Sequence, residues 1–312
     1  MRILITGVAG FLGKPLARRL LDEGHTVRGI DDLSTGDLAG LPDSVDFAQA
    51  DVTTIGHLWA AMADIDTVVH LAAHVAVRES VRYPRNYNDI NVGGTVTVLE
   101  AMRDRDARRL VFASSGAIYG TQAAQPLTED TRPAPESPYA VSKLASEHYI
   151  QTIGRLWKLQ TISLRVFNAY GPGQYLSAAH PPVIPQFFKQ ILGGGSMVIS
   201  GDGRQTRDFI YSEDVVAALA RAATIDKLPP VDVINVGSGI ETSIRDLAAL
   251  IGDITRQKPE LLHNPSGEPG VSRMQADLTR LKSTLGIVPQ TSLANGLRRI
   301  LEDDPRFNRS QS

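Results

Sequence analysis

Three glycines at intervals of three residues, Gly7, Gly10 and Gly13, follow the first apolar stretch of the chain. Residues 1–5 are mostly apolar and predict a buried strand, while residues 14–23 have helical spacing with Pro15 near their start. A strand, a glycine turn and a helix in this order are typical of a dinucleotide site on a parallel sheet. The opening of the chain therefore predicts the first unit of an open α/β fold.

Each glycine of this turn has a separate expected role. Gly7 permits the tight turn, Gly10 lets the backbone approach a pyrophosphate, and Gly13 allows the helix to pack closely. Phe11 and Leu12 lie just before the predicted helix, whose N-terminal N–H groups favour an anion. We expect all five residues to contact a dinucleotide cofactor.

The residue that follows the second predicted strand indicates which nicotinamide cofactor the protein binds. Residues 25–30 form this strand, and Asp31 follows it, where a carboxylate can accept both hydroxyls of an adenosine ribose. No arginine follows, and a 2'-phosphate would meet the anions of Asp31 and Asp32. The sequence therefore favours NAD over NADP.

Strands and helices alternate along the rest of the chain. Further strands are predicted at residues 45–48, 67–71, 109–113, 161–167 and 232–236, and helices include 92–105 and 139–156. This pattern predicts an α/β fold, a doubly wound parallel Rossmann sheet with a smaller C-terminal substrate-binding α/β domain. We assign residues 1–168 and 209–239 to the cofactor domain, and residues 169–208 and 240–312 to the second domain.

Composition narrows the class of protein. The formal net charge of -2 disfavours nucleic acid or a membrane surface as an electrostatic partner, and 0 cysteines exclude disulfides and thiolate metal sites. No apolar run reaches the roughly 18 residues that span a bilayer, and the cytoplasm is the expected location. His70 and His74 lie near Asp66 in the sequence, but no complete ligand set is evident, so we expect no metal.

A Tyr-x-x-x-Lys pair points to proton-transfer chemistry. Tyr139 and Lys143 are four residues apart on a predicted helix, so both side chains lie on one face. An ammonium beside a phenol favours the ionised form and lowers the tyrosine pKa from about 10. Tyr139 is therefore predicted to act as a base near neutral pH.

Several separate stretches carry a family resemblance. They are residues 31–36, 76–84, 91–95, 112–120, 165–168 and 201–209. Together with the glycine turn and the Tyr-Lys pair, they resemble an extended short-chain dehydrogenase/reductase of the NAD-dependent epimerase/dehydratase family, and most of all its UDP-glucose (UDP-galactose) 4-epimerases. The resemblance implies epimerisation of a nucleotide sugar at C4 through a transient 4-keto intermediate, with NAD as cofactor.

The resemblance also assigns residues. It implies that Ser115, Tyr139 and Lys143 are catalytic: Tyr139 takes a proton from a sugar hydroxyl, Ser115 holds that oxygen, and Lys143 binds the nicotinamide ribose and lowers the tyrosine pKa. Besides the residues named above, the implied cofactor contacts are Ser34, Thr35, Gly36, Asp51, Val52, Leu71, Ala72, Ala73, Asn91, Tyr139, Lys143 and Phe167. The implied substrate contacts are Val77, Ser115, Gly116, Tyr139, Asn168, Val183, Arg207, Arg273 and Met274. The family is commonly dimeric through helices near residues 88–105 and 139–155.

The chain departs from the epimerase pattern at two positions. Val75 replaces a lysine near the nicotinamide, and Gly267 stands where an arginine usually binds the diphosphate, so that Arg273 is the nearest guanidinium. Met274 occupies the position where a tyrosine is associated with rejecting N-acetyl sugars and a small residue with admitting them. Methionine is intermediate in bulk and can fold away from a larger substituent.

Other activities remain as alternatives. Dehydratases and decarboxylating relatives need acidic residues just after the catalytic serine, and here those positions are Gly116 and Ala117. A 4-keto-sugar reductase would favour NADPH, against which Asp31 argues. The sequence leaves open UDP-N-acetylglucosamine or UDP-glucuronate as the substrate, and a non-catalytic NAD-sensing protein is a more distant alternative.

Overall fold

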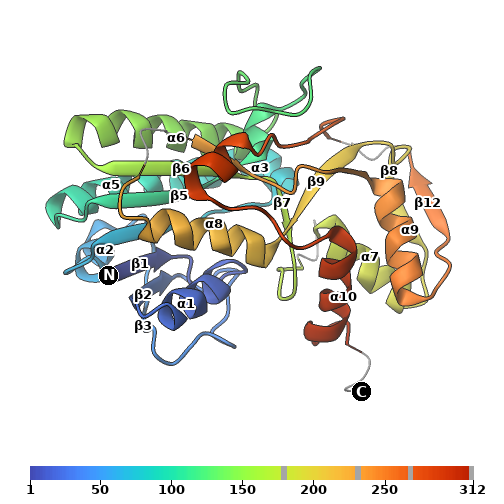
Figure 1. The fold of residues 1–312 in the computed structure, drawn as a ribbon, viewed down its shortest axis with the longest axis horizontal. Coiled ribbons are helices and arrows are strands. Elements are labelled where there is room, and N and C mark those ends of the chain that lie inside the picture. The colour runs from blue at the N-terminus through green and yellow to red at the C-terminus, as the bar shows by residue number, and fades with distance from the viewer. Residues whose placement is uncertain (177–180, 229–232, 266–269, 309–312) are drawn as a thin grey trace.

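The computed structural model describes residues 1–176, 181–228, 233–265 and 270–308 (Figure 1). Its centre is a seven-stranded parallel sheet in the order β10-β6-β5-β4-β1-β2-β3. The strands are β1 (Arg2–Thr6), β2 (Thr26–Asp31), β3 (Asp46–Gln49), β4 (Thr67–His70), β5 (Arg109–Ser115), β6 (Gln160–Val166) and β10 (Val233–Val236). The strand order reverses between β1 and β4, and ligands bind at the carboxyl ends of the strands beside such a point. The predicted doubly wound sheet is confirmed.

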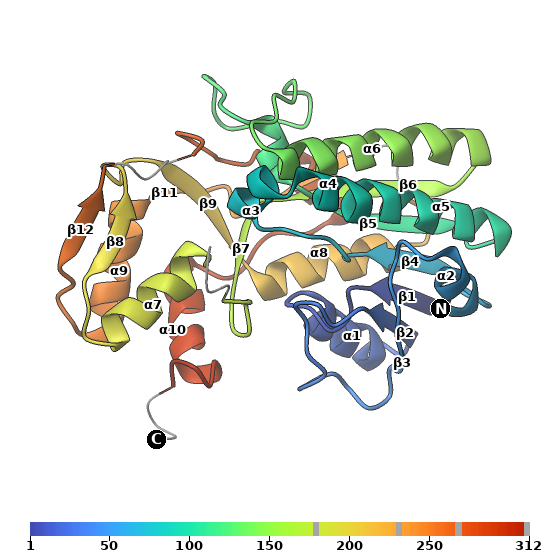
Figure 2. The ribbon, with the colours of Figure 1, turned by 180° about the vertical axis from the view of Figure 1, so that it is seen from behind.

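Helices cover both faces of this sheet. They are α1 (Gly13–Asp22), α2 (Ile55–Ala61), α3 (Val77–Arg82), α4 (Pro84–Tyr87), α5 (Gly94–Asp104), α6 (Pro138–Trp157) and α8 (Ser212–Thr224). Helices α1 and α8 lie on the face seen in Figure 1, and α2, α5 and α6 lie on the face seen in Figure 2. None of the helices in the described ranges is long and apolar enough to cross a membrane.

The apolar strand residues explain why the sheet lies between two layers. Ile3, Leu4 and Ile5 are consecutive in β1 and fully buried, as are Val68 and Val69 in β4. Consecutive apolar residues bury both faces of a strand, so each face needs a layer of helices. Two hydrophobic cores form, one on each face of the sheet.

A second, smaller group of elements lies at one end of the molecule (Figure 1). It contains a three-stranded sheet, β11-β9-β7, and a two-stranded sheet, β12-β8. Its elements are β7 (Asn168–Tyr170), α7 (Val183–Leu192), β8 (Met197–Ser200), β9 (Thr206–Tyr211), β11 (Glu241–Ser243), α9 (Ile244–Thr255), β12 (Leu261–Asn264) and α10 (Leu293–Asp303). A third core joins α7, α9 and α10 around Phe187, Phe188 and Leu247.

The two groups are joined by chain segments that are distant in the sequence. The Leu127 N–H donates to the Gln275 carbonyl at 2.7 Å, and the Asp277 N–H donates to the Leu127 carbonyl at 2.9 Å. Met274 and Ala276 are buried in the core that also contains strands of the main sheet. The division of the chain at residues 168/169, 208/209 and 239/240 stays a prediction.

The helix predicted over residues 92–105 begins earlier and changes its winding. A π-helix spans Asn88–Gly93 and leads directly into α5. The Asn91 carbonyl accepts hydrogen bonds from the hydroxyls of Thr95 (2.6 Å) and Ser146 (2.9 Å). Side chains that bond to a helix carbonyl in this way accompany a local π-bulge.

Candidate active site

The glycine turn between β1 and α1 has no room for side chains. Gly7 has φ +74°, and a Cβ there would lie 2.7 Å from the Ala72 nitrogen. A Cβ on Gly13 would overlap the Gly7 carbonyl oxygen. No described side chain caps the start of α1 at Leu12, so its first N–H groups are directed at any anion in front of the turn. This geometry fits a pyrophosphate.

The Asp31 carboxylate lies against the same turn, at the end of β2. One oxygen accepts the Ala9 N–H at 3.0 Å and the other accepts the Leu33 N–H at 2.9 Å. Burial raises the pKa of Asp31, and these two hydrogen bonds oppose that rise. Each carboxylate oxygen can accept a further hydrogen bond, as a ribose diol requires.

The loop after β2 forms a second wall. Asp32 accepts hydrogen bonds from the Ser34 N–H at 2.9 Å and the Ser34 hydroxyl at 2.7 Å. A Cβ on Gly36 would lie 2.9 Å from the Ala9 carbonyl oxygen, so this loop packs on the glycine turn. Thr35 is exposed between them. The loop that contains Ser34, Thr35 and Gly36 therefore lies beside the glycine turn and Asp31.

The loop after β3 contributes Asp51 and Val52. Asp51 is exposed and accepts hydrogen bonds from the Thr53 N–H and hydroxyl, both at 2.8 Å. Val52 is buried against Gly94, where a Cβ would lie 2.8 Å from its side chain. Both residues follow β3 at the carboxyl edge of the sheet, where the implied cofactor contacts are expected.

The segment after β4 also packs against the glycine turn. The N–H groups of Leu71 and Ala72 donate to the backbone oxygen (3.1 Å) and hydroxyl (3.2 Å) of Thr6. Ala73 follows in the same half-buried stretch. This segment forms the wall that Gly7 approaches.

Asn91 is buried and supports the site from behind. Its amide oxygen accepts the His74 N–H at 2.8 Å, and its amide nitrogen donates to the His74 carbonyl at 3.0 Å and the Ser142 hydroxyl at 2.9 Å. The side chain thus ties the loop after β4 to α6.

His70 is the last residue of β4, and its ring is buried. Its two ring nitrogens lie 2.7 Å from the Thr6 hydroxyl and 3.1 Å from the Thr95 hydroxyl. Burial lowers the pKa of His70 to about 3. The ring is therefore a neutral group inside the protein at physiological pH.

Ser115, Tyr139 and Lys143 meet at the carboxyl end of β5. The Ser115 hydroxyl lies near the Tyr139 phenol, where it favours the ionised form, and the Tyr139 N–H donates to the Ser80 hydroxyl at 3.1 Å. The Lys143 ammonium donates to the Ala113 carbonyl at 2.9 Å. A serine, a tyrosine and a lysine that the sequence separates by 28 residues thus form one cluster.

Burial dominates the titration of this cluster. It raises the pKa of Tyr139, which the hydrogen bond with Ser115 opposes, and it lowers the pKa of Lys143 to about 7, which the Glu147 carboxylate opposes. The expectation that the charges of Lys143 and NAD+ together hold the Tyr139 pKa down stays a prediction. The phenol loses more stabilisation of its anion by leaving water than its protein neighbours return.

The residues that follow Ser115 and those that follow β6 lie beside the cluster of Ser115, Tyr139 and Lys143. A Cβ on Gly116 would lie 3.1 Å from the Phe167 ring, so the glycine lets this ring approach β5. Asn168 follows Phe167 at the start of β7. Val77 begins α3, which belongs to the main sheet and its helices. Val183 begins α7, which belongs to the second group of elements.

Two predicted arginines lie on the second group. One Arg207 nitrogen donates to the carbonyls of Thr206 (2.7 Å) and Val271 (2.6 Å). Arg273 forms a two-pronged ion pair with Glu241, at 3.0 and 2.6 Å. To bind a diphosphate, Arg273 would have to leave Glu241, whereas Gly267 lies outside the described residues.

Sequence reasoning missed the acid next to Tyr139 and Lys143. Glu147 is buried and pairs with Arg165 on β6 at 2.9 Å. It follows Lys143 by four residues, so helical spacing was a signal for its place on the same face. Its partner on β6 could not be read from local spacing.

Comparison with known proteins agrees with this geometry. Residues 3–237 match the NAD dependent epimerase/dehydratase family. A UDP-glucose 4-epimerase of Mycolicibacterium smegmatis is 37% identical over 310 residues, which cover 97% of this chain and 98% of the relative. The structure of UDP-glucose 4-epimerase with UDP-glucose from Thermotoga maritima is 31% identical, with a TM-score of 0.93, and covers 100% of this chain and 99% of that one.

A further solved structure shows a related enzyme with its cofactor. The UDP-glucuronic acid 4-epimerase of Bacillus cereus, in complex with UDP-glucuronic acid and NAD, is 30% identical with a TM-score of 0.90, over 97% of this chain and 98% of that one. The fold, the glycine turn and the cluster of Ser115, Tyr139 and Lys143 thus occur together with a sequence match over most of the chain. The chain belongs to the NAD-dependent epimerase/dehydratase family.

Proposed function

We propose that the protein is an NAD-dependent nucleotide-sugar 4-epimerase that interconverts UDP-glucose and UDP-galactose through a transient 4-keto sugar. The observation that carries this proposal is the meeting of Ser115, Tyr139 and Lys143 at the carboxyl end of β5. This edge of the sheet also presents the glycine turn and Asp31. A base for the sugar hydroxyl and a dinucleotide site therefore lie at the same edge.

The protein's own groups account for the proton transfers. Tyr139 takes the proton of the C4 hydroxyl, and Ser115 donates a hydrogen bond to the same oxygen and relays the proton. Bound NAD+ supplies a reversible acceptor for the hydrogen at C4 and a positive charge that lowers the Tyr139 pKa. Asp31 holds the adenosine ribose and Lys143 the nicotinamide ribose. Rotation of the 4-keto sugar before the reverse transfer then inverts C4.

The residues beside Ser115 favour epimerisation over elimination. Gly116 and Ala117 carry no acid or base, so neither can remove a ring proton or assist loss of a carboxylate. Asp31 disfavours the NADPH that a 4-keto-sugar reductase would consume. The assembled Ser115, Tyr139 and Lys143 cluster favours an enzyme over a cofactor sensor.

We place the sugar nucleotide between the two groups of elements, which we take as the cofactor and substrate domains. Arg207 binds the diphosphate, with Arg273 as the second guanidinium after release from Glu241. Met274 is the contact that sets the pocket volume near C2. The remaining proposed contacts are Val77, Gly116, Asn168 and Val183.

Helix α6 supports a homodimer as the working form. Its outward face exposes Val141 (52%), Tyr149 (46%) and Leu156 (72%), at intervals of about two helical turns. An apolar stripe of this kind on a helix favours burial against a second copy. Sedimentation equilibrium should give twice the mass of the chain, and a monomer at all concentrations would contradict it. The cytoplasmic location stays a prediction from the sequence.

The direct test is incubation of the purified protein with NAD+ and a panel of UDP-sugars, with products resolved by NMR. We expect UDP-glucose and UDP-galactose to interconvert. Turnover confined to UDP-N-acetylglucosamine or UDP-glucuronate would change the substrate, and a 4-keto-6-deoxy product or no turnover would overturn the proposed reaction.

A further inference from the structure

Three consecutive residues at the end of β5 each contact a different residue on one face of α6. The Ala113 carbonyl accepts from Lys143 at 2.9 Å, and the next hydroxyl, that of Ser114, donates to the Glu147 carboxylate. The Ser115 hydroxyl lies near the Tyr139 phenol. The spacing of 139, 143 and 147 is one helical turn per step, so the strand and the helix are joined in a single register.

Glu147 is the most constrained group in this register. Its side chain is 1% exposed, and its two carboxylate oxygens accept from the Arg165 guanidinium at 3.1 and 2.9 Å. Arg165 lies on β6 directly opposite Ser114 on β5. The carboxylate is therefore held by two neighbouring strands while it projects from the catalytic helix.

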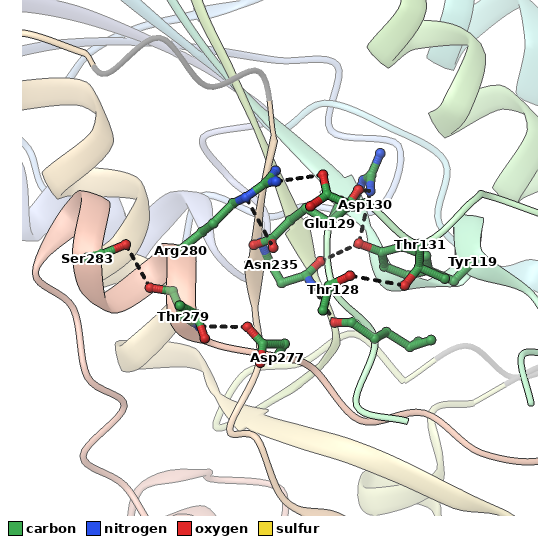
Figure 3. Close-up of polar contacts among 12 residues, drawn as sticks. Tyr119, Thr128, Glu129, Asp130, Thr131, Asn235, Asp277, Thr279, Arg280 and Ser283 are labelled. Carbon is green, nitrogen blue, oxygen red and sulfur yellow. Dashed lines mark hydrogen bonds and ion pairs between the residues drawn. The ribbon is translucent and has the colours of Figure 1, made fainter. Parts of the chain in front are cut away.

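Arg165 is itself fixed by a polar network, which continues through Tyr119, Asn235 and Glu129 to Arg280 (Figure 3). One of its nitrogens donates to the Tyr119 hydroxyl at 2.9 Å, and Tyr119 donates to Asn235 on β10 at 2.7 Å. The Asn235 N–H donates to Glu129 at 2.8 Å, and Arg280 lies 3.6 Å from the same carboxylate. A guanidinium held from this side cannot follow Glu147 if α6 moves, so the pair restrains the helix.

The surroundings of Lys143 come from four elements, β4, β5, β6 and α6. His70 on β4 is neutral, the Phe112 ring on β5 lies 4.7 Å from the ammonium, and Tyr139 lies one turn earlier on α6. Arg165 on β6 lies beyond Glu147. Within the part of the chain that the structure describes, Glu147 is the anion that acts on Lys143. Its charge opposes the loss of the ammonium that burial favours.

We propose that Glu147 is a positioning residue, which is held by Ser114 and Arg165 and thereby fixes Tyr139 and Lys143 of α6 against the end of β5. The same carboxylate lies one helical turn from Lys143, so its charge also favours the ammonium form. The inference rests on the proposed function, because it gives Glu147 a role only through those two residues. Its effect on the reaction is indirect, since Lys143 must be charged to assist the tyrosine and bind the nicotinamide ribose.

The test is an NMR titration of the full-length protein saturated with NAD+ and labelled with ¹³C at the lysine ε-carbon, with Lys143→Arg to assign the signal. Glu147→Gln should lower the Lys143 pKa by about 1 unit or more, because it removes a nearby opposite charge. Glu147→Asp should restore most of the wild-type value. Ser114→Ala is the matched control, since it removes a hydrogen bond to the same carboxylate without changing charge, and should shift the pKa by less than half as much.

Activity provides the second readout. The alkaline limb of the kcat/KM profile should move to lower pH in Glu147→Gln and stay in place in Ser114→Ala. An unchanged Lys143 pKa in Glu147→Gln, or equal shifts in Glu147→Gln and Ser114→Ala, would overturn the proposal.

Glu147→Gln leaves the Arg165 charge buried without its partner and can fail to fold for that reason. The double variant Glu147→Gln/Arg165→Met removes both charges. It should still lower the Lys143 pKa, and a wild-type value there would count against the proposal. The titration needs no turnover, so a wild-type protein without epimerase activity would defeat the proposed function while the titration still decides the role of Glu147.

Discussion

Tyr139 is positioned by its backbone as well as by its phenol. Its N–H donates to Ser80 on α3 at 3.1 Å, and α6 is capped beside it by Ser137, whose hydroxyl accepts from Ala140 at 3.2 Å. The first turn of α6 is thus bound to a second helix and to its own cap. Because burial raises the Tyr139 pKa, the base depends on this fixed contact with Ser115 and on nearby positive charge.

Tyr139→Phe tests the base directly. The ring and the backbone bonds remain, so the variant should retain its fold and bind NAD, as measured by calorimetry. Turnover should fall by about two to four orders of magnitude, because general base catalysis is lost. Near-normal kcat in this variant would remove Tyr139 from the mechanism.

Asp31 offers a test of cofactor choice. NAD should bind much more tightly than NADP, and Asp31→Ala should narrow the gap, because it removes charged hydrogen bonds worth about 1.5–3 kcal/mol each and relieves repulsion of a 2'-phosphate. Titration calorimetry with both cofactors measures this. Asp22→Ala, an exposed carboxylate at the other end of α1, should leave both affinities unchanged. Equal wild-type affinities would refute the assignment.

At the scale of elements, the glycine turn links folding to cofactor binding. Gly13→Ala places a methyl group on the Gly7 carbonyl oxygen, so we expect a loss of about 1–3 kcal/mol in unfolding free energy together with weaker NAD binding. Denaturant unfolding and calorimetry check both effects.

Gly56→Ala is the matched control for that change. Gly56 lies in α2, and no other atom lies within 4 Å of a Cβ built there. Alanine should therefore raise stability by about 0.5–1 kcal/mol and leave NAD affinity unaltered. If Gly13→Ala behaves like Gly56→Ala, the turn does not need its glycines for close approach.

The elements that the sequence predicted well are those with a local signal. The apolar run of β1, the glycines and the helical spacing of α1 are contiguous, and the structure confirms this unit. The π-helix Asn88–Gly93 was missed because it depends on Ser146, a hydroxyl on another helix. Hydrogen bonds between distant segments leave no periodic trace in a single sequence.

At the scale of the whole molecule, the same limit applies to the site. Ser115, Tyr139 and Lys143 could be proposed from motifs, because each lies in a recognisable run. Glu147 and Arg165 form their pair only through the register of α6 on β5 and β6. The Tyr139 pKa likewise depends on burial, which the spacing of two residues does not give.

The packing of distant segments also joins the two groups of elements. Arg280, near the C-terminal end, pairs with Asp130 at 2.6 Å, and Leu127 bonds with the backbone of Gln275 and Asp277. These contacts place residues 273–277 beside the loop that follows Ser115. A change in the second group can therefore alter the position of this loop.

The central claim is that hydrogen leaves C4 of the sugar and returns to the same carbon on the opposite face. UDP-galactose carrying deuterium at C4, incubated in ordinary water with the NAD-loaded protein and followed by NMR, tests it most directly. The account predicts UDP-glucose that retains deuterium at C4. Loss of the label to solvent during conversion would contradict it.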